Sequence, residues 1–161
     1  MIPHSRSNLL LLIALVSFGA VGIALISQHV YDYPPCAWCV FQRLIYVVIG
    51  VVALAGALVP KLGRAAALLS GILGVGGVVS AWYQHAVAAE MVSCDRTFAD
   101  QFMVKSGLDG ALPSVFGIFA TCMDAKVQVL GVEYAIWSLM LFIVLIALSI
   151  VAWRRASPLV A

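Results

Sequence analysis

The second apolar segment of the chain opens with YPPCAWCVFQR, residues 33–43, where a short polar connection gives way to a long hydrophobic run. Two consecutive prolines end any preceding helix and fix the backbone angle expected in the first turn of the next one. A helix that starts near Pro35 places Cys36 and Cys39 in its first turns, where free backbone N–H groups and the helix dipole favour a thiolate. Arg43 shares their face, because positions i, i+3 and i+7 of a helix line up. The stretch therefore predicts redox-active cysteines at a membrane boundary.

The composition is that of a polytopic membrane protein. Of the 161 residues, 64% are hydrophobic and only 10% are charged, and the mean hydropathy is +1.10. A soluble domain of this size does not need so much apolar surface. The net charge of +2 says little as a total, whereas the distribution of the charges along the chain is informative.

Four apolar runs are long enough to cross the roughly 30 Å hydrocarbon core of a bilayer. We predict spans at about residues 9–27, 40–59, 65–84 and 134–153. The first run is longer than the apolar region of about 7–15 residues in a signal peptide, so we expect it to be retained. Together the runs predict an all-α integral membrane protein. Residues 1–161 would form a single domain, a four-helix transmembrane bundle.

Charges at the ends of the spans predict the orientation. Five basic residues flank the spans on one side, and all seven acids lie on the other side. The basic residues are Arg6, Lys61, Arg64, Arg154 and Arg155, and the acids are Asp32, Glu90, Asp95, Asp100, Asp109, Asp124 and Glu133. The positive-inside rule places both termini in the cytoplasm. The connections 28–39 and 85–133 would then be periplasmic loops of a multi-pass protein in the bacterial inner (cytoplasmic) membrane.

The second outward connection, residues 85–133, is too apolar to be a plain loop. Phe98, Phe102 and Met103 fall on one helical face, and residues 115–120 are mostly apolar. A short horizontal helix lying on the bilayer surface would account for this pattern. A small globular lid packed on the helix ends is the alternative. Either arrangement holds the two cysteines of this connection close to the membrane plane.

All four cysteines lie in or beside the outward connections, Cys36 and Cys39 in the first and Cys94 and Cys122 in the second. In an oxidising compartment two pairs predict two disulfides, and structural staples are the simplest interpretation. A disulfide across three helical residues is strained and easily reduced, however, which suits it to exchange. A zinc site would need two close pairs, and haem attachment would need a histidine in place of Val40. We therefore expect no metal.

Arg43 and His85 are the other candidate site residues. Arg43 lies about one turn into a span, where a charge costs free energy unless it snorkels or has a partner. Because it shares a face with the cysteines, we expect it to stabilise a thiolate or to hydrogen-bond a polar ligand. His85 ends the third span on the same side of the membrane, where it either caps the interface or contacts the ligand.

These features resemble the disulfide bond formation protein B (DsbB) family of quinone-dependent membrane thiol oxidases. The resemblance covers nearly the whole chain, and it rests on the order and spacing of several motifs rather than on Cys-x-x-Cys alone. The motifs are CAWC at 36–39 followed by Arg43, YQH at 83–85, Cys94 and Cys122, PSVF at 113–116, and LGVE at 130–133. One departure is Val127, because members often carry Trp five residues after the last cysteine.

The resemblance implies an enzyme, a quinone-dependent protein-disulfide oxidoreductase that re-oxidises a DsbA-like periplasmic thiol oxidase. Electrons would pass from the partner dithiol through the loop pair and the Cys-x-x-Cys pair to ubiquinone or menaquinone. The catalytic residues implied are Cys36, Cys39, Cys94 and Cys122, and the quinone contacts implied are Cys39, Arg43 and His85. The expected partners are this thiol oxidase, membrane quinone and the lipid bilayer, with no nucleic acid.

Two other functions stay open at this point. A vitamin K epoxide reductase-like oxidase also joins thiol exchange to quinone, but in that family the Cys-x-x-Cys follows the loop pair, whereas here it comes first. A non-enzymatic membrane scaffold with two structural disulfides is the other alternative. Quinone-dependent thiol oxidation by the purified protein would distinguish an enzyme from a scaffold.

Overall fold

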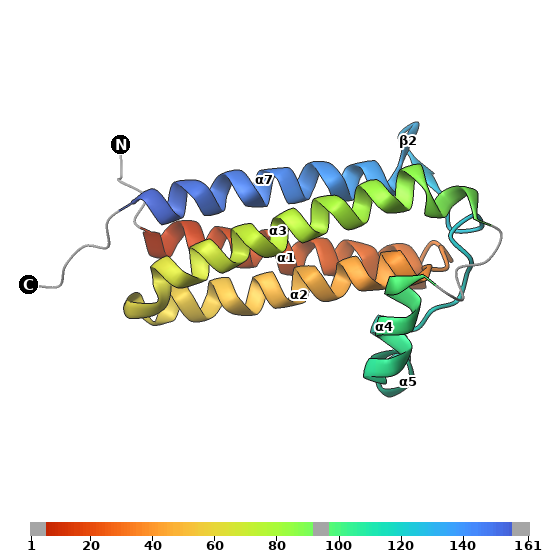
Figure 1. Ribbon diagram of the computed structural model, residues 1–161, viewed down its shortest axis with the longest axis horizontal. Coiled ribbons are helices and arrows are strands. Elements are labelled where there is room, and N and C mark those ends of the chain that lie inside the picture. The colour runs from red at the N-terminus through yellow and green to blue at the C-terminus, as the bar shows by residue number, and fades with distance from the viewer. Residues whose placement is uncertain (1–5, 92–96, 156–161) are drawn as a thin grey trace, which may run out of the picture.

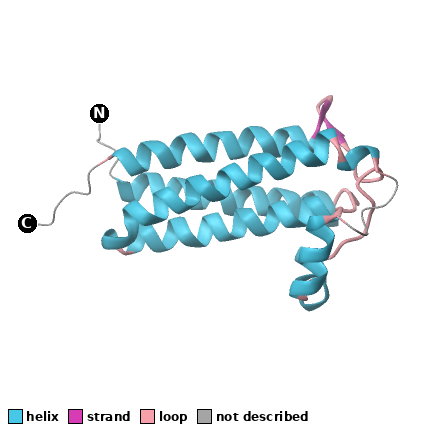
Figure 2. Ribbon diagram, in the orientation of Figure 1, coloured by secondary structure: helices cyan, strands magenta, loops and turns pink. Residues whose placement is uncertain are grey.

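Four long helices form a bundle in the computed structural model, which describes residues 6–91 and 97–155 (Figures 1 and 2). They are α1 (Arg6–His29), α2 (Ala37–Leu58), α3 (Gly63–Ala86) and α7 (Tyr134–Arg154). At about 1.5 Å per residue each is about 32–36 Å long, enough to cross the core of a bilayer. The predicted four-helix membrane bundle is confirmed, and the helices begin and end within three residues of the predicted limits.

The start of α1, the turn between α2 and α3, and the end of α7 lie at the same end of the bundle (Figure 1). A short 3-10 helix, η1 (Pro60–Leu62), makes the turn. Arg6 donates from Nε to the carbonyl oxygen of Ala152 at 3.2 Å, and Ser7 donates from Oγ to that of Ala57 at 2.9 Å. These hydrogen bonds join α1 to α7 and to α2 at the end that the charges assign to the cytoplasm.

The core of the bundle depends on a glycine that admits an aromatic ring. A Cβ at Gly77 of α3 would lie 2.3 Å from the ring of Phe142 on α7. Phe142 is fully buried, and its ring stacks on Tyr46 of α2 with 4.1 Å between centroids. Large apolar side chains such as Leu15 and Val79 instead face outward, as expected for helices surrounded by lipid. Among neighbouring helices α1 and α7 make the loosest pair.

The connection between α3 and α7 folds over the opposite end of the bundle (Figure 1). It contains η2 (Ala88–Glu90), α4 (Phe98–Ser106), α5 (Leu108–Ala111), α6 (Pro113–Phe116), β1 (Gln128–Val129) and β2 (Val132–Glu133). Helix α4 runs across the long direction of the bundle, the orientation expected of a helix on a membrane surface. Met103 of α4 is fully buried against Val40 and Phe116, and Phe98 and Phe102 contact the ring of Phe41.

The short hairpin of β1 and β2, directly before the last span, is an element that the sequence analysis did not predict. Val129 pairs with Val132, and the two residues between them both have positive φ, 56° at Leu130 and 80° at Gly131. Two left-handed residues are typical of the tight turn that joins hairpin strands, although a leucine there is unusual. The hairpin lies directly before α7, beside the site described next.

Candidate redox site

Two backbone hydrogen bonds fasten the second outward connection to the first. The carbonyl oxygen of Pro35 accepts from the N–H groups of Phe119 at 3.0 Å and Ala120 at 3.3 Å. This use of the Pro35 carbonyl keeps the chain extended up to Cys36, which is the N-cap of α2 with φ −86° and ψ 172°. The expectation that both cysteines lie in the first turns is therefore wrong for Cys36, which precedes the helix.

The same fastening brings Cys122 to the Cys-x-x-Cys motif. Cys36 and Cys122 are both almost fully buried, and they pack in one apolar cluster with the partly buried Cys39. Cys122 is disulfide-bonded, whereas Cys36 and Cys39 are free thiols with 3.1 Å between their Sγ atoms. The predicted site residue Cys94 lies outside the described residues. A hydrogen bond to Cys39, together with burial, raises the pKa of the Cys36 thiol well above its ordinary value.

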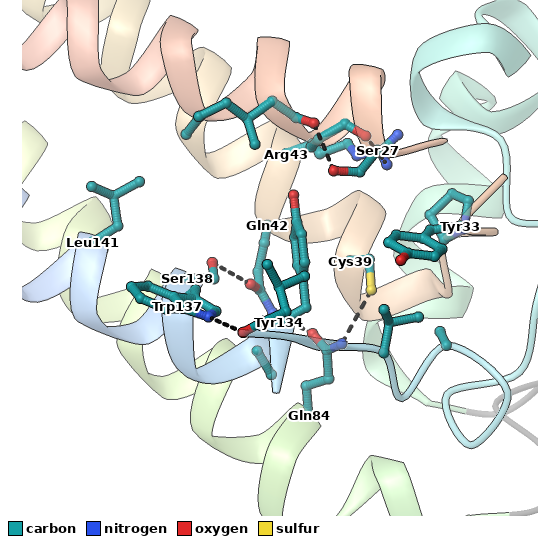
Figure 3. A pocket seen from close by; sticks show the side chains of 18 of the residues that line it. Ser27, Tyr33, Cys39, Gln42, Arg43, Gln84, Tyr134, Trp137, Ser138 and Leu141 are labelled. Carbon is teal, nitrogen blue, oxygen red and sulfur yellow. Dashed lines mark hydrogen bonds between the residues drawn. The ribbon is translucent and has the colours of Figure 1, made fainter. Parts of the chain in front are cut away.

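A cavity of about 550 Å³ lies beside Cys39, lined by residues of α1, α2 and α7 and by the hairpin (Figure 3). It is lined in part by α1 and α7, the loosest pair of neighbouring helices. Its lining is largely apolar, with Ile23, Leu141 and Val144 among the residues that contribute. Val127, the departure from the family pattern, forms part of this wall.

Arg43 lines the same cavity, but much of its guanidinium is already used. The side chain is buried, with 6% of its surface exposed. Its Nη1 donates to Oε1 of Gln28 at 2.5 Å and to the carbonyl oxygen of Val115 at 2.9 Å, and its Nη2 donates to that of Ala24 at 3.3 Å. Arg43 therefore ties α2 to the outer end of α1 and to α6. Among the described residues, three of its N–H groups have acceptors, which leaves two that can serve a ligand.

Two glutamines that the sequence analysis did not single out also contact the site. Gln84 of α3 donates from Nε2 to Cys39 Sγ at 3.1 Å, and Gln42 of α2 donates to Gln84 Oε1 at 2.6 Å (Figure 3). Both are buried and both line the cavity. The signal that could have found them is their position, because a polar side chain inside a membrane span requires a partner.

His85 lies beyond the residues that line the large cavity. Its Nδ1 is 2.5 Å from Oε2 of Glu133, and Lys126 is 3.2 Å from Glu90 and 3.6 Å from Glu133. His85, Lys126 and Glu133 line a second, very small cavity that Cys122 also lines. The imidazole thus holds the hairpin to the end of α3, and its predicted contact with a ligand stays a prediction.

Free thiols packed against a disulfide-bonded cysteine, in a membrane bundle with an apolar cavity, are suited to thiol–disulfide exchange coupled to a membrane-soluble compound. The fold and the site therefore define a membrane thiol-disulfide oxidoreductase.

Comparison with known proteins identifies the family. The chain matches the family described as "Disulfide bond formation protein DsbB" over residues 6–152. It is 35% identical to the disulfide bond formation protein B of Cupriavidus necator, across 90% of this chain and 91% of that protein. Identity is 34% to the protein of the same name from Ralstonia nicotianae, with 90% and 92% covered, and 32% to that from Albidiferax ferrireducens, with 97% and 92% covered. The chain belongs to the disulfide bond formation protein B family, as its motifs predicted.

Proposed function

We propose that the protein re-oxidises a DsbA-like periplasmic thiol oxidase and passes the electrons through two cysteine pairs to a membrane quinone. The observation that carries this proposal is the position of Cys39, a free thiol whose side chain lines a largely apolar cavity at the outer end of the bundle. A reactive sulfur beside an apolar cavity suits an electron acceptor that is dissolved in the bilayer.

The residues around the cavity fit a quinone. Ile23, Leu141 and Val144 supply apolar walls for the ring and its isoprenoid tail, and Arg43 supplies the two free N–H donors for a ring oxygen. When bound, the quinone supplies a two-electron acceptor, and the protein supplies position and electrostatics. Ubiquinone and menaquinone share these features, so we propose either as the acceptor.

We assign the relay to Cys36, Cys39, Cys94 and Cys122. A thiolate of the partner attacks Cys94 of a Cys94–Cys122 disulfide, and Cys122 leaves with the electron pair as a thiolate. Cys122 then attacks Cys36 of the oxidised Cys36–Cys39 pair, and Cys39 leaves as the thiolate beside the quinone. The packing of Cys122 with Cys36 in one buried cluster supports this order.

We further propose that residues 1–161 form one domain in the bacterial inner membrane, with both termini in the cytoplasm. The basic residues at the end of the bundle that holds Arg6 and Arg155 support this orientation. A reporter that works only in the cytoplasm should be active when it is fused after Arg155, and a reporter that works only in the periplasm should be inactive there. After reduction, a thiol reagent added from outside should reach Cys94 and Cys122, and an external C-terminus would overturn the orientation.

The decisive experiment uses the purified protein, a reduced DsbA-type protein and a soluble ubiquinone analogue. Loss of the quinone absorbance should track oxidation of the partner, and Cys39→Ser should abolish both. If the partner is not oxidised, the proposed function is wrong and a scaffold with structural disulfides becomes the better interpretation. If the partner is oxidised without quinone reduction, the proposed electron acceptor is wrong.

Removing a resolving cysteine tests the order of the relay. Cys122→Ser, with the other three cysteines intact, should accumulate a mixed disulfide between the partner and Cys94, because no neighbouring thiolate can displace it. Peptide mapping of the adduct identifies the attached cysteine. Attachment through Cys36 or Cys39 would contradict the proposed order.

A further inference from the structure

A buried chain of hydrogen bonds runs from Cys39 across the bundle to α7. Gln84 Nε2 lies 3.1 Å from Cys39 Sγ, and its Oε1 accepts from Gln42 at 2.6 Å. Gln42 in turn accepts through Oε1 from the hydroxyl of Ser138 at 2.6 Å, and the Tyr46 hydroxyl lies 3.0 Å from Ser138 Oγ. Figure 3 shows Gln42 between Ser138 and Gln84, with Gln84 directed at the sulfur. Each group thus contacts the next one along a single path.

A thiolate at Cys39 determines the direction of the hydrogen bonds from Gln84 through Gln42 to Ser138. A thiolate only accepts hydrogen bonds, so the NH₂ group of Gln84 must face it and the Gln84 oxygen must face Gln42. Gln42 then donates to Gln84 and must accept from Ser138, whose single hydroxyl hydrogen is thereby used. All the donors therefore align toward the sulfur, an arrangement in which each hydrogen bond polarises and strengthens the next.

We propose that Gln84 is a catalytic residue that stabilises Cys39 as the leaving thiolate, and that Gln42 and Ser138 are positioning residues that aim its amide. This inference rests on the proposed relay. When the Cys122 thiolate attacks Cys36, a Cys122–Cys36 bond forms and the Cys36–Cys39 bond breaks. The electron pair of the broken bond goes to Cys39 Sγ, where the N–H of Gln84 receives the new negative charge.

The geometry explains why Cys39, and not Cys36, is the sulfur that carries the charge. The Gln84 nitrogen is 3.1 Å from Cys39 Sγ and 3.7 Å from Cys36 Sγ, so its stronger hydrogen bond goes to Cys39. The described hydrogen bonds of Arg43 go to carbonyl and amide oxygens rather than to sulfur. The Cys36 thiol is equally near Cys39 Sγ, at 3.1 Å, but in the proposed step Cys36 is bonded to Cys122 and has no S–H to donate. Among the described residues, the neutral amide of Gln84 is then the side-chain donor that contacts the leaving thiolate.

The test measures the Cys39 thiolate directly, without quinone and without a partner protein. The full-length chain with Cys36, Cys94 and Cys122 changed to serine keeps Cys39 as its single cysteine. Iodoacetamide alkylates the thiolate and not the thiol, so its rate at neutral pH reports how much thiolate is present. Because a hydrogen bond to a charged group is lost, Gln84→Met should slow alkylation by about tenfold or more. Gln128→Met, an exposed glutamine on β1, is the matched control and should not change the rate.

The positioning residues give the second measurement. Ser138→Ala leaves Gln84 in place but removes the hydrogen bond that Gln42 Oε1 accepts from Ser138. It should slow alkylation of Cys39 by about threefold. The ultraviolet absorbance of the thiolate should fall in parallel, whereas at strongly alkaline pH all variants should react at the parent rate. Unchanged rates at neutral pH would overturn the proposal, as would a difference that persists at alkaline pH, which indicates altered access. If Gln84→Met does not fold, Ser138→Ala decides by the same criteria, and neither result depends on the quinone or the partner.

Discussion

Each end of the bundle contains an arginine that donates hydrogen bonds to backbone carbonyl groups. Comparing the two distinguishes an arginine that only stabilises the fold from one that also lines the site. At one end Arg6 donates to the carbonyl oxygens of Ala152 and Arg155 near the end of α7. At the other end Arg43 donates to the carbonyl oxygens of Ala24 and Val115. Both arginines thus donate to backbone carbonyl groups of neighbouring helices, at or near the helix ends.

What differs is the surroundings of the two side chains. Arg43 is buried and lines a cavity that also contains Cys39, whereas Arg6 is only partly buried and lies at the end that holds the basic residues. A membrane arginine with backbone acceptors is therefore not by itself evidence of a site. The Cys39 thiol and the cavity beside it are what indicate a site at the end of the bundle that contains Arg43. Substitutions at the two ends should therefore have different effects.

The largest difference is expected between Arg43→Ala and Arg6→Ala. Arg43→Ala removes the ligand donors and the hydrogen bonds to the Val115 and Ala24 carbonyls, so apparent quinone affinity should fall by about tenfold to a hundredfold. Arg43→Lys should restore part of it, because lysine keeps the charge but loses the planar fork. Arg6→Ala should lower thermal stability and leave the quinone affinity within about twofold.

Steady-state turnover at varied quinone concentration, at matched levels of folded protein, measures these affinities. An Arg43→Ala protein with the parent affinity would mean that this arginine only holds α1, α2 and α6 together, as Arg6 holds α1 and α7.

The middle of the bundle, between the two ends, should respond in stability. At Gly77 any side chain meets the buried ring of Phe142, whereas a Cβ at Gly76 has no neighbouring atom within 4 Å. Gly77→Val should therefore destabilise the bundle by about 1–3 kcal/mol, the usual cost of overpacking. Gly76→Val faces open space and should cost much less. Thermal unfolding in detergent compares the pair, and equal losses would show that α3 and α7 do not pack as described.

At the outer end, the rate at which Cys36 is alkylated should depend on pH. The hydrogen bond to Cys39 and burial raise the pKa of the Cys36 thiol well above its ordinary value of 9.0. A raised pKa means that the proton stays on Cys36 as the pH rises through 9. In a Cys39→Ala, Cys94→Ser, Cys122→Ser chain the burial contribution remains, so iodoacetamide should modify Cys36 slowly at neutral pH and faster in alkali. Fast alkylation at neutral pH would contradict the burial of this sulfur.

Much of the fold and part of the site could be predicted from the sequence, and the division has a physical cause. Apolar length is a property of single segments, so the four spans follow from it, whereas the orientation inferred from the charges stays a prediction. Cys36, Cys39 and Arg43 share one short stretch, and helical spacing was enough to place the last two on a common face. The N-cap position of Cys36 was missed because it depends on the Pro35 carbonyl, which accepts a hydrogen bond from the N–H of Phe119, 84 positions further along the chain.

The glutamine chain was missed for the same reason. Gln42, Gln84 and Ser138 come from three helices, and only the packing of those helices brings their side chains together. The pairing of His85 with Glu133 likewise joins the end of α3 to a hairpin that the sequence did not reveal. Residues that act through one helix can be found by spacing, whereas residues that act across helices need the fold.

The smallest effect is expected where the outer end is most exposed to solvent. Glu133 contacts both His85 and Lys126, and 18% of its side chain is exposed, whereas Glu90 contacts Lys126 with 74% exposed. Water and salt screen such pairs, and a pair contributes more when one partner is partly buried. Glu133→Gln should therefore lower Tm by about 2 °C or less, with the loss shrinking at high salt, and Glu90→Gln should have no measurable effect. A larger loss of Tm for Glu133→Gln, one that salt does not reduce, would show that the hairpin needs this carboxylate for its fold. The outer end of the bundle would then depend on buried polar contacts at β2 as well as at Arg43.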